Sequence, residues 1–146
     1  VERESRPVKA MTREERLEDR VLEFGTINGR DGRRKYRYAY STLAEPGWFL
    51  FRGFTKTDAQ TGRTTQFELG ANRFGSEAPF APRIGSAAED DGYLVSFVTD
   101  ENTGMSECIL LDAAHLEDGP VCRIALPHKL CSGTHACWAG REQLRA

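Results

Sequence analysis

The side chains best suited to bind a metal in this chain are its three histidines, His115, His128 and His135. His135 lies in the segment Ser-Gly-Thr-His-Ala-Cys-Trp, where small neighbours let an imidazole project into a confined space. His115 lies in a polar segment typical of a surface turn, and His128 lies at the expected end of a strand. Taken alone, one such histidine is more often a hydrogen-bonded core residue than a metal ligand.

The chain also has four cysteines, Cys108, Cys122, Cys131 and Cys137, with no C-x-x-C pair. Free thiols are expected, which favours a reducing compartment and a cytoplasmic location. A zinc site built from Cys131, His135 and Cys137 is the alternative. Residues two apart on a strand are about 6.7 Å apart, whereas the ligand atoms around a tetrahedral zinc lie about 3.5 Å from one another. The spacing therefore disfavours zinc.

Two carboxylates have apolar sequence neighbours. Glu23 lies between Leu and Phe, and Glu77 precedes Ala-Pro-Phe. A carboxylate in apolar surroundings needs a partner to offset its desolvation. An arginine or a backbone N–H is the ordinary partner, and an imidazole N–H would link the carboxylate to a histidine. By contrast, Glu89, Asp90 and Asp91 are expected to form a solvated turn.

The elements that position these residues are predicted to be strands. Residues 1–20 are mostly charged and form at most a loop or a short helix, with Thr12 and Glu15 in a capping-box arrangement. From residue 21 to residue 146 the pattern predicts an all-β chain without long helices. Strands are expected at residues 36–40, 48–51, 64–69, 78–83, 93–99, 107–112 and 121–126. The aromatic side chains expected in the core are Trp48, Phe49, Phe51, Phe74 and Phe80.

A weak repeat suggests how these strands are arranged. The pattern T-D-x-x-T-G occurs at residues 57–62 and again at 99–104, about 40 residues later, the period of a four-stranded propeller blade. The chain has room for one complete blade, at about residues 77–126, and most of another. Because a blade buries its faces against neighbouring blades, about three repeats are needed for a continuous core. We therefore expect the chain to be part of a larger protein.

Composition excludes some functions. The formal net charge is -2 and charged residues make up 29% of the chain, with both signs interspersed, so no nucleic-acid partner is predicted. No apolar run approaches the roughly 18 residues that a membrane span needs, so no membrane span is predicted either.

Five ordered motifs resemble those of the carotenoid cleavage oxygenase family. They are Leu22-Glu23-Phe24 with Ile27-Asn28, Tyr36–Tyr40, Gly75–Arg83, Glu89–Leu94, and the closing pair Leu126–His128 and Gly133–His135. The closing segment is similar to that of the bacterial lignostilbene dioxygenases. The chain departs from the usual family pattern at Gly25, Ala78 and Ala136, and none of these departures removes a ligand.

The resemblance implies a seven-bladed β-propeller, of which this chain holds the C-terminal blades. It also implies an Fe(II) ion held by four histidines, the last of them His135. Glu23 and Glu77 are implied to accept hydrogen bonds from ligand histidines, which fixes the tautomer and orientation of the imidazole. His115 and His128 match no ligand motif, so the other three ligands must lie in other blades, and the segment alone is expected to be inactive.

The expected function is therefore that of part of an Fe(II)-dependent dioxygenase. This enzyme is expected to use O2 to cleave the carbon–carbon double bond of a small-molecule alkene to two aldehydes. A lignostilbene is the expected substrate. The expected partner is the remaining set of propeller blades, and the substrate-binding residues are not assigned. Three alternatives stay open: a carotenoid or apocarotenoid substrate, a non-catalytic propeller fragment, and a small zinc or redox protein that uses the cysteines.

Overall fold

The computed structural model describes residues 19–32, 34–131 and 134–145. Most of the charged lead segment, with Thr12 and Glu15, lies outside the described residues. Within them the chain forms nine strands and the single-turn 3-10 helices η1 (Gly29–Asp31), η2 (Leu116–Asp118) and η3 (Gln143–Arg145). The predicted all-β class is therefore confirmed. None of the described helices is long and apolar enough to cross a membrane.

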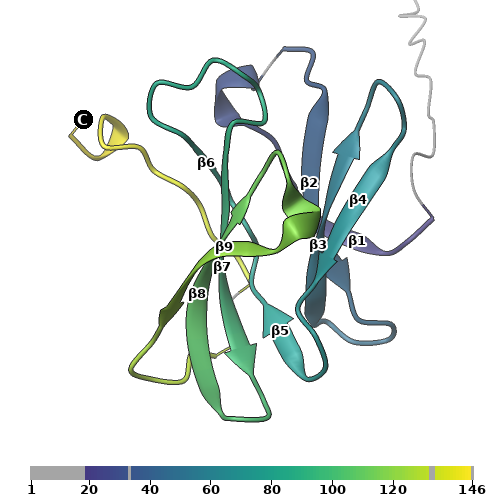
Figure 1. Cartoon of the computed structure of the whole chain (residues 1–146), viewed down its shortest axis with the longest axis vertical. Helices are drawn as coiled ribbons and strands as arrows, with labels where there is room; N and C mark the ends of the chain where they lie inside the picture. The colour runs from purple at the N-terminus through teal and green to yellow at the C-terminus, as the bar shows by residue number, and fades with distance from the viewer. Residues whose placement is uncertain (1–18, 33, 132–133, 146) are drawn as a thin grey trace, which may run out of the picture.

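The first four strands form an antiparallel meander, which we call unit 1 (Figure 1). Each of the first three pairs with the strand that follows it along the chain. They are β1 (Leu22–Thr26), β2 (Tyr38–Ala44), β3 (Phe51–Asp58) and β4 (Thr64–Glu68). The strand expected at residues 36–40 thus begins two residues later and is longer than expected.

The remaining five strands form unit 2, in which two short strands share one edge of a long one. They are β5 (Arg73–Gly75), β6 (Phe80–Pro82), β7 (Gly92–Asp100), β8 (Met105–Asp112) and β9 (Pro120–Ala125). β5 and β6 pair with the two halves of β7, and β8 and β9 complete the meander. Unit 2 therefore has four strand positions, the number in a propeller blade. A single pairing between β3 and β5 joins the two units.

The apolar core lies between the two units. Tyr40 and Phe54 of unit 1 and Leu94, Val98 and Ile109 of unit 2 are at most 1% exposed and belong to one cluster. The Tyr40 hydroxyl donates a 3.1 Å hydrogen bond to a main-chain carbonyl of unit 2, and burial raises the pKa of this phenol. Because residues from both units fill one core, each unit fixes the position of the other.

Both T-D-x-x-T-G segments form hairpin turns of the same design. In the β3–β4 turn the Asp58 carboxylate accepts a 2.9 Å hydrogen bond from the main-chain N–H two residues later, and Gly62 takes a φ of +72°. In the β7–β8 turn Asp100 does the same at 2.9 Å, and Gly104 takes a φ of +67°. The aspartate opens each turn and the glycine supplies the left-handed residue that closes it. The repeat seen in the sequence is therefore also a structural repeat.

Each turn aspartate also pairs with an arginine from the neighbouring strand, a feature that the sequence analysis missed. Nη2 of Arg37 lies 2.8 Å from Oδ2 of Asp58, and Nη1 of Arg73 lies 2.6 Å from Oδ2 of Asp100. The Arg37 guanidinium holds the pKa of Asp58 well below its usual range. The arginines stand at unequal distances from the turns in sequence, so only the strand pairing reveals that they are equivalent.

Trp48 and Phe49 are not core residues, contrary to the sequence-based expectation. They are 73% and 60% exposed and lie in the turn between β2 and β3. A 2.7 Å main-chain hydrogen bond closes this turn, and a glycine within it takes a positive φ. The apolar run therefore crosses the turn, and the strand begins only at Phe51. Phe51 and Phe80 are buried as expected, whereas Phe74 is partly buried.

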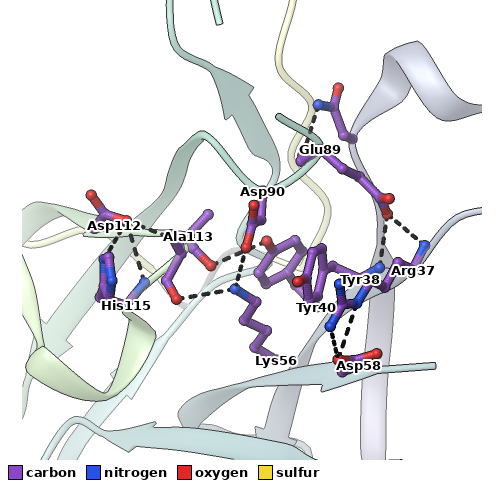
Figure 2. A network of polar contacts seen from close by, with 12 residues as sticks. Arg37, Tyr38, Tyr40, Lys56, Asp58, Glu89, Asp90, Asp112, Ala113 and His115 are labelled. Carbon is purple, nitrogen blue, oxygen red and sulfur yellow. Dashed lines mark hydrogen bonds and ion pairs between the residues drawn. The ribbon is translucent and has the colours of Figure 1, made fainter. Parts of the chain in front are cut away.

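The acidic run before Gly92 is not a solvated turn, which corrects a second expectation. Figure 2 shows Glu89 capping the start of β2, where its Oε1 accepts hydrogen bonds from the N–H groups of Arg37 at 2.7 Å and Tyr38 at 2.8 Å. Asp90 lies 2.8 Å from Nζ of Lys56, whose side chain is 11% exposed. Both carboxylates thus offset the desolvation of groups that unit 1 buries. The run connects unit 2 to unit 1.

We predict that Glu89→Ala lowers the free energy of unfolding by about 2 kcal/mol, because two main-chain N–H groups lose a charged acceptor. Equilibrium urea denaturation measures this change. The matched control is Glu117→Ala, since Glu117 is exposed, and it should change stability by no more than about 0.5 kcal/mol. Equal stability of Glu89→Ala and the unmodified protein would contradict the assigned role.

Candidate metal-ligand site

Glu77 lies where the ladder along β7 is interrupted between β5 and β6. The Ser76 N–H still bonds to the Phe97 carbonyl at 2.8 Å, but the Phe97 N–H bonds to the Ser76 side-chain Oγ at 3.1 Å instead of a main-chain carbonyl. Main-chain pairing resumes where the Val95 N–H reaches the Pro79 carbonyl at 3.2 Å. The register gains one residue across this gap, as in a β-bulge. The bulge carries the glutamate away from the regular ladder.

Two buried serines support the main chain at this bulge. Ser76 and Ser96 are 4% and 0% exposed, and their hydroxyl oxygens lie 3.2 Å apart. Ser96 Oγ also lies within hydrogen-bond distance of the Ser76 carbonyl, at 3.1 Å. Since buried hydroxyls must be satisfied, this pair locks the residue that precedes Glu77. The position of the carboxylate is therefore fixed from inside the protein.

The Glu77 carboxylate faces His135, which lies beyond β9 on the C-terminal segment. Its Oε2 accepts a 2.7 Å hydrogen bond from the Ala136 N–H and lies 3.5 Å from Nδ1 of His135. Glu77 is 18% exposed, whereas His135 is 81% exposed. One oxygen thus orients both the imidazole and the main chain next to it. With Nδ1 turned to the carboxylate, Nε2 is the nitrogen that can bind a metal.

Phe24 borders the same imidazole on another side. The two ring centroids lie 5.1 Å apart, with the planes at 71° in an edge-to-face arrangement. The ring of Phe24 also packs against Phe51 at 5.1 Å and Phe49 at 6.0 Å. These contacts bring β1 of unit 1 to the C-terminal segment, which Figure 1 shows in yellow passing the meeting point of the units.

The backbone of Phe24 is strained. Its φ is +50°, in the left-handed region, and the register of β1 against β2 slips at this residue. A bulky side chain rarely adopts this conformation, which costs roughly 1–2 kcal/mol relative to the right-handed one. Two strand irregularities, one in each unit, therefore converge on His135.

Glu23 borders a groove that is also lined by Val21, Trp48 and Phe49. Glu23 is exposed, because β1 turns its alternate residues Leu22 and Phe24 inward and Glu23 outward. Within the described residues its carboxylate has no hydrogen-bond or ion-pair partner; only its main-chain carbonyl is bound, by the Thr42 hydroxyl at 2.9 Å. The structure does not bring Glu23 to His135. A role as partner of another ligand histidine stays a prediction.

The other histidines lie apart from this site. His115 precedes η2, is 70% exposed and lies beside an aspartate of its own turn, and His128 is exposed. In the part of the chain that the structure describes, no group of three His, Cys, Asp or Glu residues is placed to hold a metal ion. The described residues therefore do not supply a complete metal site around His135.

The four cysteines are free thiols, as expected. Cys131 and Cys137 are exposed and do not gather with His135 into a metal-binding cluster. Cys108 is half-buried, and burial, with a smaller contribution from Cys122, raises the pKa of its thiol.

Phe24, Ser76 and Ser96 were not identified as site residues from the sequence. Ser76 carries a usable signal, because it is a small polar residue directly before a carboxylate in an otherwise apolar strand region. Phe24 carries none. Nothing about a phenylalanine indicates a positive φ, and its contact with His135 spans most of the chain.

Comparisons with known proteins place these features in a family. The model of the family described as retinal pigment epithelial membrane protein matches residues 3–140. A carotenoid 9,10(9',10')-cleavage dioxygenase from Crocus sativus is 37% identical over 139 residues, covering 86% of this chain and 26% of that protein. A lignostilbene-alpha,beta-dioxygenase, isozyme III, from Sphingomonas paucimobilis is 30% identical over 135 residues, covering 85% and 28%.

Solved structures of the Synechocystis apocarotenoid oxygenase have the same fold. A variant of it gives a TM-score of 0.79 at 29% identity, covering 84% of this chain and 26% of that chain. The cobalt-substituted form gives a TM-score of 0.72 at 26% identity, covering 80% and 25%. The expected incomplete propeller is thereby confirmed.

The comparisons also limit what is known. The chain spans about a quarter of the length of the curated relatives it matches. They do not single out the lignostilbene branch, because the plant carotenoid enzyme has the higher identity. Three assignments stay predictions: His135 as a metal ligand, Glu23 and Glu77 as hydrogen-bond partners of ligand histidines, and the boundary at residue 20. The match over residues 3–140 and the shared fold show the family of this chain. The chain belongs to the retinal pigment epithelial membrane protein family, the carotenoid cleavage oxygenases.

Proposed function

We propose that this chain forms the last blades of an Fe(II)-dependent dioxygenase that cleaves a carbon–carbon double bond, and that His135 is one ligand of the iron. The observation that carries the proposal is the position of the Glu77 carboxylate, 3.5 Å from Nδ1 of His135 and 2.7 Å from the next main-chain N–H. A carboxylate on the far nitrogen is the usual support of a metal-bound imidazole.

Each residue has a distinct task in this proposal. Glu77 keeps the proton of His135 on Nδ1, so that Nε2 stays unprotonated and can donate its lone pair. The hydrogen bond that the Ala136 N–H donates to Glu77 restrains the main chain next to His135. A ferrous ion bound at such a site supplies the activation of O2 for attack on the alkene.

The proposal requires further blades, and the exposed face of unit 2 supports their presence. On this outer face, two rows of apolar side chains cross the sheet. One row is Val95, Leu110 and Cys122, and the other is Phe97, Cys108 and Ile124. Phe97 is 44% and Ile124 50% exposed, although Leu94 and Val98 on the opposite face of β7 and Ile109 and Leu111 on the opposite face of β8 are fully buried. A sheet that is apolar on both faces is typical of one packed between two layers.

A groove extends this outer face toward the C-terminal segment. It has a volume of about 430 Å³, and its lining includes Tyr93, Ile84 and Trp138 in addition to Val95 and Leu110 of the first row. Ile84 is fully exposed and Trp138 is 50% exposed. Contiguous apolar surface of this kind marks an interaction site. We assign it to an adjoining blade of the same protein.

For the substrate, we propose a carotenoid or apocarotenoid polyene. The relative with the higher identity of the two compared acts on a carotenoid, and solved structures with the same fold include an apocarotenoid oxygenase as well as a lignostilbene dioxygenase. A lignostilbene is the second candidate, because the lignostilbene dioxygenase is also 30% identical. Both substrates present a conjugated carbon–carbon double bond to the iron, so the chemistry is common to both.

We predict that His135→Ala, made in the longer protein, lowers bound iron from about one ion per chain to a small fraction, because one of the proposed ligands is lost. Iron content after anaerobic reconstitution and desalting measures this. The matched control is His115→Ala, since His115 is exposed and lies away from the site, and it should keep wild-type iron. Equal iron loss in both variants would contradict the ligand assignment.

A second prediction concerns the outer face. Phe97→Asp in the longer protein should lower the free energy of unfolding by about 3 kcal/mol, because a buried charge without a partner is strongly destabilising. Thermal and urea denaturation measure the change. Gln60→Asp, at the exposed tip of the β3–β4 turn, is the control and should have little effect. If Phe97→Asp is equally harmless, no blade covers this face.

A third prediction concerns the substrate. The iron-loaded longer protein should convert an apocarotenoid to two carbonyl fragments with uptake of one O2 per double bond cleaved, and His135→Ala should abolish this. Chromatography of the products and an oxygen electrode measure the reaction. Cleavage of a lignostilbene but not of the polyene would move the assignment to the second candidate. Failure to cleave either would contradict the proposed activity.

A further inference from the structure

We propose that Phe24 is a positioning residue for the proposed ligand His135, and that the strained bulge of β1 exists to place its ring there. This inference rests on the proposed function and extends it to a residue that contacts the imidazole from the other unit. Phe24 lies on β1, the carboxylate lies at the bulge in β7, and His135 lies on the C-terminal segment.

The first step of the argument is that Glu77 alone leaves the imidazole poorly restrained. Its Oε2 lies 3.5 Å from Nδ1, longer than an ordinary N–H···O hydrogen bond, and the His135 side chain is 81% exposed. A ring held at one corner can still pivot about that corner. The edge-to-face contact with Phe24, at 5.1 Å and 71°, blocks one direction of this pivot.

The second step is that the position of the Phe24 ring is itself fixed. Phe51, which is 1% exposed, packs against it at 5.1 Å and an interplanar angle of 69°. Phe51 belongs to β3, the central strand of unit 1, and pairs with Gly75 at the junction between the units. The contact with His135 is therefore supported by the rigid part of the sheet rather than by a free loop.

The third step is the backbone. A residue at φ +50° would normally be glycine or asparagine, and phenylalanine is among the least suited. The same bulge with a small residue would lack the strain and also lack the ring. A phenylalanine with a positive φ lowers the stability of β1 locally. Its presence is explained if the ring has a role other than stabilising the fold. Strain of this kind is found at functional sites.

The alternative is that Phe24 has only a packing role, as one ring of an aromatic cluster. Phe49 provides the matched control, because it packs against both Phe24 at 6.0 Å and Phe51 at 5.2 Å. No ring contact joins Phe49 to His135 among the described residues. A packing role predicts similar effects from Phe24→Leu and Phe49→Leu, whereas a positioning role predicts a difference at the metal.

The experiment uses the longer protein loaded with Co(II), whose d–d absorption reports ligand geometry. Phe24→Leu should weaken Co(II) affinity by roughly tenfold, the lower end of the range for groups that orient metal ligands, and should change the d–d bands. Phe24→Tyr, which keeps the ring, should restore both. Phe49→Leu should match the unmodified protein. Phe24→Asn, which suits the left-handed backbone but lacks the ring, should also weaken Co(II) binding.

The outcomes separate the two proposals. If Phe24→Leu keeps the affinity and the spectrum of the unmodified protein while His135→Ala loses Co(II), Phe24 has no positioning role and the proposed function stands. If His135→Ala binds Co(II) as the unmodified protein does, the ligand assignment itself is wrong and this inference falls with it. If Phe24→Leu and Phe49→Leu weaken binding equally, Phe24 acts only through packing, which also overturns the inference.

Discussion

Tyr40 and Phe54 from unit 1 pack against Leu94 and Val98 from unit 2, and the rest of the structure depends on this shared core. It requires a very close approach of the two units, because a Cβ added at Gly75 would lie only 2.8 Å from the ring of Phe54. Neither unit alone offers this core enough partners. The residues of the candidate site come from both units, so their distances are set by how the two units pack.

The site itself is made from two places where regular strand pairing fails. At one, a serine side chain replaces a main-chain acceptor, and Glu77 leaves the ladder. At the other, β1 slips its register and Phe24 takes a positive φ. A regular strand alternates its side chains between two faces and cannot direct them along its edge. The bulges let the two units present side chains to a third segment, the one that carries His135.

Charge in this protein is used to connect elements more than to cover the surface. Glu89 binds two main-chain N–H groups at the start of β2, and Asp90 neutralises the largely buried Lys56. The hairpin aspartates Asp58 and Asp100 each organise a turn and pair with an arginine of the adjacent strand. Because Glu89 and Asp90 bind groups that are partly or largely buried, their loss is costlier than that of an exposed ion pair.

By itself, the sequence determined the all-β class, most strand positions and the two matching turns. Alternation of apolar residues and the aspartate and glycine of a turn act within a few residues, so they can be read locally. Through resemblance, its motifs also indicated His135 as a metal ligand, and Glu23 and Glu77 as hydrogen-bond partners of ligand histidines. Only the tertiary structure decided that Trp48 lies in an exposed turn, that Glu89 caps a distant strand and that Phe24 contacts the imidazole. Each of these depends on which surface folds back onto which, and that is settled by the packing of the two units.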